Sequence, residues 1–421
     1  MLDFLTSFAV ITLSSLLLGS ILSKLRLPPI VSMLIVGIVF GPYVLNLISP
    51  SIMSVSADLR QLALVIILTR AGLNLDLSLL RKNGRSAILM CFLPALTEIA
   101  AYIVLGYFLL NIDVLSAAIL GCVMSAVSPA VIVPRMLKLK QHNYGTAKGI
   151  PDMIMAGASA DDVVVIVLFT ALCTMTDSGT LDLNILWRIP VSIVTGTVTG
   201  ILLGIAFVRF VKKVHMRDSI KVMTMLSLSC LLLFVENVTE AYLPFSGLLS
   251  IIAFNAVIFH KHTECAARLS EKYNKLWLFA EIVLFVLVGA EVDVSFAFSI
   301  NGLMLLPCIA LALLVRMGGV WLCLVGSHLN RKERLFTAIA YCPKATVQAA
   351  IGAIPLSMGL SSGQLILTAA VLAILITAPL GAIAIDNLYK KLLTHDVNTT
   401  DDNDSQSNTA VDMPTDTQVG L

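Results

Sequence analysis

Long apolar segments, separated by short polar loops, make up almost the whole chain. A segment of about 20 apolar residues is long enough to cross the hydrocarbon core of a bilayer as a helix. The pattern therefore predicts a bundle of thirteen transmembrane helices. They cover residues 4–23, 29–48, 58–77, 86–110, 114–137, 147–175, 187–210, 219–236, 243–260, 275–293, 300–326, 333–357 and 364–389.

The composition supports an all-α polytopic membrane protein. Of the 421 residues, 58% are hydrophobic and 13% are charged, whereas soluble domains carry about 25% charged residues. The net charge of +2 comes from basic residues in short loops, so we expect no nucleic-acid partner. The eight cysteines are scattered without paired spacing, which argues against disulfides and zinc ligands.

The loops alternate in charge along the chain. Every second loop is rich in lysine and arginine, beginning with Lys24 and Arg26 after the first segment. The positive-inside rule then puts the N-terminus outside and the C-terminus in the cytoplasm, and we expect the plasma (cytoplasmic) membrane as the location. We divide the chain into a membrane domain, 1–395, and a disordered acidic cytoplasmic tail, 396–421, which lacks basic residues.

Prolines interrupt two of the predicted helices. The fifth contains Pro129 and Pro134, and the twelfth contains Pro343; each proline removes a backbone donor and disturbs a helix. Seven segments separate the two interruptions, which predicts two inverted six-helix repeats with crossed discontinuous helices, as in many transporters. Ordinary kinks are the alternative. The repeats would cover about 4–175 and 219–389, with a linker helix at about 187–210.

Two adjacent acids, Asp161 and Asp162, lie about midway along the sixth segment. An aspartate near the bilayer centre costs roughly 2.5–3.5 kcal/mol on insertion scales, so two of them require an explanation. Neighbours on a helix point about 100° apart, which allows the two carboxylates to meet different partners. Static ion pairs that only hold helices together are the alternative interpretation.

A dehydrated carboxylate beside hydroxyl groups suits a small hard cation such as Na+ or Li+. Burial disfavours a bare negative charge, so a proton replaces the cation when the cation is absent. Competition between cation and proton for one carboxylate is sufficient for antiport by alternating access, and it needs neither a cofactor nor enzyme chemistry. The hydroxyls expected beside the aspartates are those of Ser128, Ser159 and Thr346.

Three further charges lie deep inside apolar segments, Glu98, Arg316 and Lys344, while Arg70 and Glu281 lie nearer the ends of theirs. An arginine keeps its charge when buried, whereas a lysine can lose its proton. We therefore expect Arg316 to be a permanent partner of a carboxylate, either Glu98 or Asp161. Lys344 follows Pro343 in an interrupted helix, where its charge can neutralise the carbonyl ends of half-helices.

These segments resemble the motifs of the cation:proton antiporter superfamily, and more narrowly those of NHA-type sodium/proton antiporters (exchanger subfamily B). The resemblance covers essentially the whole membrane region. The matching segments are Ser128–Pro129, Gly157–Asp162, Leu314–Met317, Pro343–Gly352 and Ile376–Pro379.

The resemblance implies a homodimer in the lipid membrane, with a dimerisation scaffold and a mobile six-helix core that contains the crossed helices. It implies that Asp162 is the main ion-binding carboxylate and Asp161 its neighbour, that Glu98 stabilises Arg316, and that Lys344 lies at the crossing. Electrogenic members of the superfamily often have a lysine where this chain has Arg316, which favours electroneutral exchange here.

Two other activities remain open at this point. Potassium/proton antiport or potassium efflux occurs elsewhere in the superfamily, often with a cytoplasmic nucleotide-binding domain, for which this sequence shows no counterpart. A sodium-coupled solute symporter of related fold would be expected to have a larger pocket of neutral polar residues.

Overall fold

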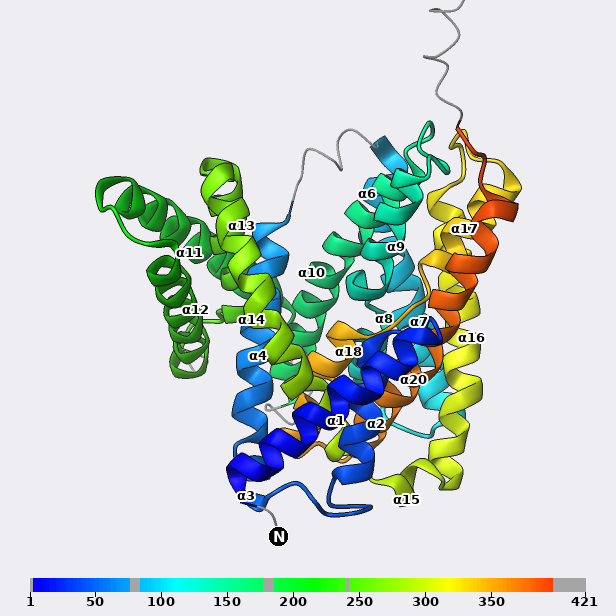
Figure 1. Cartoon of the computed structure of the whole chain (residues 1–421), viewed down its shortest axis with the longest axis horizontal. Helices are drawn as coiled ribbons and strands as arrows, with labels where there is room; N and C mark the ends of the chain where they lie inside the picture. The colour runs from blue at the N-terminus through cyan, green and yellow to red at the C-terminus, as the bar shows by residue number, and fades with distance from the viewer. Residues whose placement is uncertain (1–2, 76–83, 177–184, 240–241, 397–421) are drawn as a thin grey trace, which may run out of the picture.

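The computed structural model describes residues 3–75, 84–176, 185–239 and 242–396, and these residues form a bundle of α-helices (Figure 1). The described β-structure is one isolated antiparallel bridge, between Tyr144 and His395. This confirms the expected all-α fold. Nine helices of the described residues are long and apolar enough to cross a membrane. Each of the thirteen predicted segments coincides with one, two or three helices, while the number of membrane crossings stays a prediction.

The first group of helices, which we call the scaffold bundle, comes from the beginning and the middle of the chain. In it α14 packs against both α2 and α4, and α13 packs against α4 and α11. Figure 1 shows α11, α12 and α13 at one side of the molecule. Its members are α1 (Phe4–Lys24), α2 (Pro29–Phe40), α3 (Pro50–Ser54), α4 (Ser56–Leu73), α11 (Ile185–Lys213), α12 (Asp218–Thr239), α13 (Gly247–Lys261) and α14 (Thr263–Ala290).

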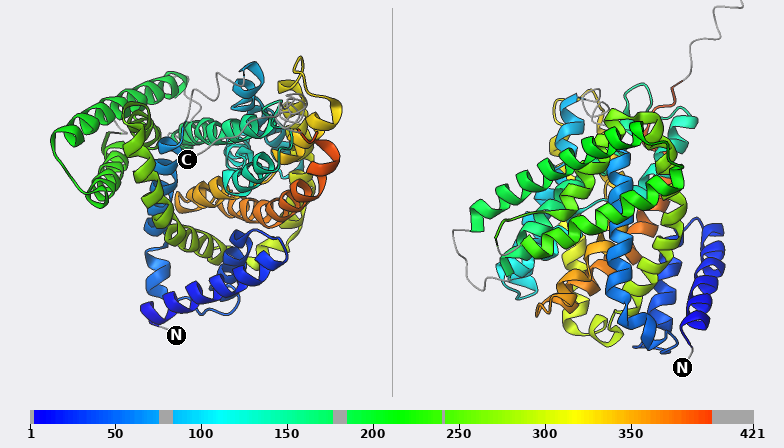
Figure 2. Two further views of the ribbon diagram at one scale, coloured as in Figure 1. Left: turned by 45° about the horizontal axis from the view of Figure 1, so that its top comes forward. Right: turned by 90° about the vertical axis from the view of Figure 1, so that its left-hand side faces the viewer.

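The second group, the core bundle, lies beside the scaffold bundle (Figures 1 and 2). In it α7 packs against α8 and α16, while α17 packs against α20. Its members are α6 (Gly84–Met90), α7 (Leu93–Leu109), α8 (Val114–Ser125), α9 (Pro129–Gln141), α10 (Ile150–Thr176), α15 (Val294–Ala297), α16 (Ile300–Cys323), α17 (Arg331–Ala340), α18 (Thr346–Ile351), α19 (Ile354–Ser357) and α20 (Gly363–Leu392).

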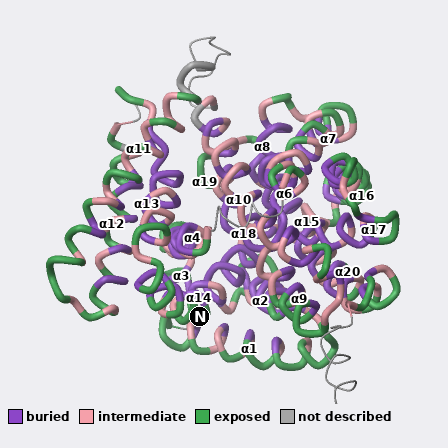
Figure 3. The backbone as a smooth tube through the Cα atoms, turned by 90° about the horizontal axis from the view of Figure 1, so that it is seen from above, coloured by how far each residue is buried: buried purple, intermediate pink, exposed green. Residues whose placement is uncertain are grey.

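Burial increases from the periphery to the boundary between the two bundles. In the view from above, α1, α11, α12 and α16 carry exposed residues on their outer sides, and the buried residues gather around α4, α14 and α18 (Figure 3). Many of the exposed side chains are large and apolar, for example Leu17 of α1 and Leu314 of α16. Such an outer surface is suited to lipid and would be unfavourable in water.

Two helices differ from their predicted bounds more than the others do. Helix α14 begins at Thr263 instead of residue 275, because its first three turns are polar and charged, and a hydropathy window does not detect a polar extension of an apolar helix. Helix α2 ends at Phe40 instead of residue 48, because the following Gly41–Pro42 pair cannot continue a helix.

The expected interruptions lie at residues 126–128, between α8 and α9, and at residues 341–345, between α17 and α18. Pro129 is the first residue of α9, a position where the missing N–H costs no hydrogen bond. Pro343 lies within the second interruption. The prediction for Pro134 was wrong, because this proline lies inside α9 and the helix continues through it. Neighbouring groups in membrane helix bundles can satisfy the one carbonyl that such a proline frees.

The tail boundary predicted at residue 396 also needs correction. The carboxylate of Asp396 accepts hydrogen bonds from Thr146 Oγ1 (2.8 Å) and from the Ala147 N–H (2.7 Å). Partial burial opposes the charge of Asp396, but these hydrogen bonds outweigh it and lower the pKa of the carboxyl below its ordinary value. Asp396 therefore belongs to the core bundle, and the rest of the predicted tail lies outside the described residues.

Candidate functional site

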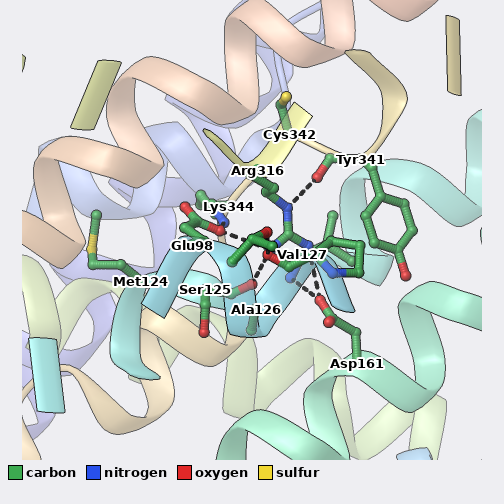
Figure 4. A network of polar contacts seen from close by, with 12 residues as sticks. Glu98, Met124, Ser125, Ala126, Val127, Asp161, Arg316, Tyr341, Cys342 and Lys344 are labelled. Atoms are coloured by element: carbon green, nitrogen blue, oxygen red, sulfur yellow. Dashed lines mark hydrogen bonds and ion pairs between the residues drawn. The ribbon is translucent and has the colours of Figure 1, made fainter. Parts of the chain in front are cut away.

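The two interruptions meet in the middle of the core bundle, at a place that we call the crossing. The Ser128 N–H, just before α9, donates to the carbonyl of Pro343 at 2.8 Å. The second interruption also packs closely on α20, where the Pro343 ring leaves no space for a side chain at Gly381. Non-helical backbone inside a membrane protein is tolerated only where other groups form hydrogen bonds with its N–H and C=O groups. The surrounding side chains do this, and they are the charged residues that the sequence analysis selected (Figure 4).

Asp161 of α10 points into the crossing and is completely buried. Its Oδ2 atom accepts from the Val127 N–H at 3.1 Å and from Arg316 Nη2 at 2.9 Å. Asp161 is therefore an anchored anion, held by one backbone donor and one guanidinium. The sequence analysis left open whether Arg316 pairs with Glu98 or with Asp161, and the structure shows ion pairs with both.

Asp162 points elsewhere, as expected for the next residue of a helix. It lines a small cavity between α4, α10, α13 and α18, at the boundary of the two bundles. The cavity has a volume of about 10 Å³, which is room for about one water. Its other walls are apolar: Leu64, Ile67, Leu68, Ala71, Val163, Ile166, Ile252, Val347 and Ala350. Within the described part of the chain, Asp162 forms no ion pair, and its Oδ1 has no hydrogen-bond partner.

Arg316 of α16 joins both broken helices. Its Nε donates to the carbonyl of Tyr341, just after α17, at 2.7 Å, and its Nη1 donates to the carbonyl of Ser125, the last residue of α8. Nη1 also donates to Glu98 Oε2 at 2.7 Å. Carbonyl groups at helix C-termini carry partial negative charge, which a permanent cation stabilises. One guanidinium thus satisfies two helix ends and two carboxylates.

Lys344 has a narrower role than the sequence indicated. Its Nζ donates to Glu98 Oε2 at 2.6 Å, and its backbone N–H donates to Thr377 Oγ1 at 2.9 Å. We expected Lys344 to neutralise the carbonyl ends at the crossing, but Arg316 contacts those carbonyls instead. The guanidinium reaches several acceptors at once because it has five N–H groups in a fixed plane.

The charges of this network balance without Asp162. Glu98 and Asp161 contribute −2, and Arg316 and Lys344 contribute +2, so the sum is zero. All four side chains are at most 1% exposed. A balanced network of this kind has no electrostatic need for a further ion. The residue Asp162, in contrast, is 7% exposed, and no basic side chain of the described residues forms an ion pair with it.

The three predicted hydroxyl ligands differ in their surroundings. Ser128 Oγ and Thr346 Oγ1 are buried and have no hydrogen-bond partner among the described residues. Ser159 Oγ lies one turn before Asp162 on α10 and donates to the carbonyl of Met155 at 3.0 Å. Buried polar atoms without partners are rare and often mark a place for an ion or water. Ser128 and Thr346 therefore meet this criterion, while the Ser159 hydroxyl already has an acceptor.

Two polar residues at the crossing had not been selected from the sequence. Tyr341 lies with its ring 5.1 Å from the Arg316 guanidinium and donates its hydroxyl to the Met90 carbonyl at 2.9 Å. Gln348 of α18 is completely buried and donates from Nε2 to the carbonyl of Ala126 at 2.8 Å. A glutamine in an apolar segment two residues after Thr346 was a detectable signal, because a buried amide needs partners.

This chain resembles known sodium/hydrogen exchangers along most of its length. Residues 10–391 match the family model described as "Sodium/hydrogen exchanger, transmembrane". Sodium/hydrogen exchanger 9B2 of Homo sapiens is 34% identical over 370 residues, which are 85% of this chain and 68% of that protein. Sodium/hydrogen exchanger 9B1 of Homo sapiens is 33% identical over 407 residues, which are 91% and 77% of the two chains.

A solved structure resembles the fold. The sodium proton antiporter MjNhaP1 from Methanocaldococcus jannaschii superimposes with a TM-score of 0.76 at 21% identity. The match covers 93% of this chain and 99% of that chain. At this identity the likeness concerns the fold alone, and it extends to nearly every described helix.

Proposed function

The chain belongs to the transmembrane sodium/hydrogen exchanger family, whose members are membrane transporters and not enzymes, and on that premise we propose that it exchanges Na+ or Li+ for protons. The cation and the proton compete for Asp162, in the membrane domain of residues 1–395. One observation carries this proposal: Asp162 is a buried carboxylate outside the balanced network, and it forms no ion pair with the described residues. Either ion neutralises it, so occupancy by one excludes the other.

The charge balance of the network favours electroneutral exchange. Glu98, Asp161, Arg316 and Lys344 sum to zero, and Arg316 cannot release a proton at physiological pH. If Asp162 alone changes its occupant, one sodium ion exchanges for one proton and the site is neutral in both loaded forms. Transport of a second proton would require Asp161 to leave its contacts with Arg316 and the Val127 N–H.

Alternating access is supported by the place of Asp162 at the boundary of the two bundles. The scaffold contributes Leu64, Leu68 and Ile252 to the cavity wall, and all three are apolar. Apolar surfaces make no directional bonds, so the core can move past them at low cost once Asp162 is neutral. A charged Asp162 would have to cross this surface uncompensated, which couples movement to ion binding. The two inverted repeats remain the proposed basis of this movement.

The proposed setting is a homodimer in the plasma membrane, with the N-terminus outside and the C-terminus in the cytoplasm. The exposed apolar side of α1, which includes Leu13 and Leu17, supports a contact with lipid or with a second copy in the membrane. Ser128 and Thr346 are proposed as further oxygen ligands, since their hydroxyls are buried and without described partners. We keep Ser159 as a ligand that would have to turn away from Met155.

The test is ion-driven proton movement in proteoliposomes that contain the purified protein. We expect addition of Na+ or Li+ to move protons through the wild type, and Asp162→Asn to abolish this response. Asp152→Asn is the matched control, because Asp152 lies on the same helix but pairs with Lys140 at the surface. A response to K+ alone would favour potassium exchange, and full activity of Asp162→Asn would reject the site.

The stoichiometry is tested in the same vesicles. Electroneutral exchange should proceed at the same rate whether or not the membrane potential is clamped at zero. A rate that rises with an imposed potential would show net charge movement and would mean that a second group, Asp161 or Lys344, also changes its proton during transport.

A further inference from the structure

One peptide group in the interruption between α8 and α9 is held from both sides. Its carbonyl, that of Ala126, accepts from Gln348 Nε2 at 2.8 Å, and its N–H, that of Val127, donates to Asp161 Oδ2 at 3.1 Å. The peptide unit is planar and trans, so its C=O and N–H point in opposite directions. Gln348 and Asp161 together therefore fix the rotation of this single plane.

This peptide group belongs to neither helix, because α8 ends at Ser125 and α9 begins at Pro129. Its hydrogen bonds are therefore not supplied by a regular ladder. A buried carbonyl without a donor is unfavourable, and the backbone would rotate to find one. Gln348 is completely buried, so water cannot easily take its place. The amide of Gln348 thus determines in which direction the Ala126 carbonyl points, and with it the direction of the Val127 N–H.

The peptide groups on either side of the 126–127 peptide have other hydrogen-bond partners than Gln348. The Ser125 carbonyl is satisfied by Arg316, and the Ser128 N–H by the Pro343 carbonyl. These groups flank the 126–127 peptide but leave its own rotation free. The Nε2 atom of Gln348 also lies 3.5 Å from the Met124 carbonyl oxygen, so the side chain points toward the end of α8.

We propose that Gln348 is a positioning residue for the aspartate pair: it acts through the 126–127 peptide to keep the Val127 N–H on Asp161. With this donor in place, Asp161 stays anchored beside Arg316, and the next residue of α10, Asp162, presents its carboxylate to the cavity. Without it, Asp161 loses a donor and can reorient, and the change reaches Asp162 through the shared backbone. The inference rests on the proposed exchange function and adds a residue from α18 to its site.

The coupling also joins distant parts of the chain. Gln348 comes from the second half of the sequence and Ala126 from the first, 222 residues earlier. A movement of α18 relative to α8 would therefore shift the Val127 N–H that donates to Asp161, although Gln348 does not contact that carboxylate directly. A residue that only fills space at this place would not have this effect on ion binding.

Two substitutions separate these roles. Gln348→Met keeps the length of the side chain and removes the donor. Gln348→Leu places an apolar side chain of similar size there and likewise has no donor for the Ala126 carbonyl. We expect both variants to raise the KM for Na+ about fivefold or more, the amount that corresponds to one lost neutral hydrogen bond, with a smaller change in maximal rate. Gln364→Met is the matched control, because Gln364 lies at the start of α20 and outside the crossing.

Coupling to Asp161 provides the decisive measurement. Sodium affinity is read from the ion-induced rise in melting temperature, so that variants with slow transport can still be compared. Removing the acceptor with Asp161→Leu should abolish most of the effect of Gln348→Met on sodium affinity, because the Val127 N–H then has no carboxylate to hold. Gln348→Leu serves in the same cycle if the methionine variant is not recovered folded.

The outcomes are distinct. Non-additive effects of Gln348 and Asp161 on sodium affinity support the inference. Additive effects, or an unchanged KM in folded Gln348 variants, would overturn it and leave the exchange function standing. If the wild type itself moves no protons in response to Na+ or Li+, the proposed function fails, and that result is seen before any Gln348 variant is examined.

Discussion

Arg316 offers the sharpest test of the buried charge network. Replacing it with glutamine removes the partner of Glu98 and Asp161 and the donors to the Ser125 and Tyr341 carbonyls. The network charge changes from zero to −1, with all members still buried. Removing one partner of a buried ion pair costs about 3–5 kcal/mol, because the other charge stays behind without compensation.

This cost can be expressed as a melting temperature. An unfolding entropy of about 2.1 cal/mol/K per residue gives about 0.9 kcal/mol/K for 421 residues. Arg316→Gln should therefore lower the melting temperature by about 3–6 °C, measured in detergent by intrinsic fluorescence. Lys140→Gln is the control. Its ion pair with Asp152 has side chains 42% and 31% exposed, and such a surface pair contributes about 1 kcal/mol or less.

The double variant tests the reasoning itself. In Arg316→Gln with Glu98→Gln, Asp161 and Lys344 remain, and their charges again sum to zero. We expect the double variant to lose less stability than the two single variants together. The difference, the coupling free energy, should be about 1–3 kcal/mol. Simple additivity of the two losses would show that charge balance does not stabilise the crossing, and the network would then have to be explained by packing alone.

Two further predictions concern the contacts around the crossing and the loop beside α10. Gly381→Ala should lower the melting temperature, because a methyl group there meets the Pro343 ring and overpacking costs about 1–3 kcal/mol; Gly318→Ala, in open space, should leave it unchanged or raise it. The carboxylate of Asp396, whose pKa is lowered below 3.8, should hold the Ala147 N–H at neutral pH and release it only as the pH falls through that lowered pKa. Hydrogen exchange at Ala147, compared between wild type and Asp396→Asn, should therefore differ at neutral pH and converge in strong acid; equal protection at neutral pH would show that Asp396 does not hold this loop.

The two adjacent carboxylates, Asp161 and Asp162, have different surroundings in the structure. Two adjacent acids in a transporter invite the interpretation that each carries one ion. Here Asp161 Oδ2 accepts from Arg316 and from the Val127 N–H, and Asp162 faces an apolar cavity. We therefore propose that Asp161 is part of the frame and that Asp162 takes the cation or the proton. This division follows from their directions on the helix and from the location of the Arg316 guanidinium.

The sequence by itself determined the helices and the identity of the buried charges. Hydropathy locates apolar helices because burial in lipid is a property of each segment, and Pro129 and Pro343 mark interruptions because proline lacks an N–H. Such local signals contain no information about neighbouring helices. The sequence therefore predicted a break at Pro134 that α9 does not have.

Only the tertiary structure decided which groups meet. Arg316 bonds to Glu98, 218 residues away, and to Asp161, 155 residues away. Helical periodicity gives the face of each side chain but not the helix opposite it, so the choice between Glu98 and Asp161 stayed open in the sequence. The contact of Lys344 with Glu98, and that of Gln348 with the Ala126 carbonyl, depend on how two broken helices cross. That crossing is set by the packing of the whole core bundle, which no single segment encodes.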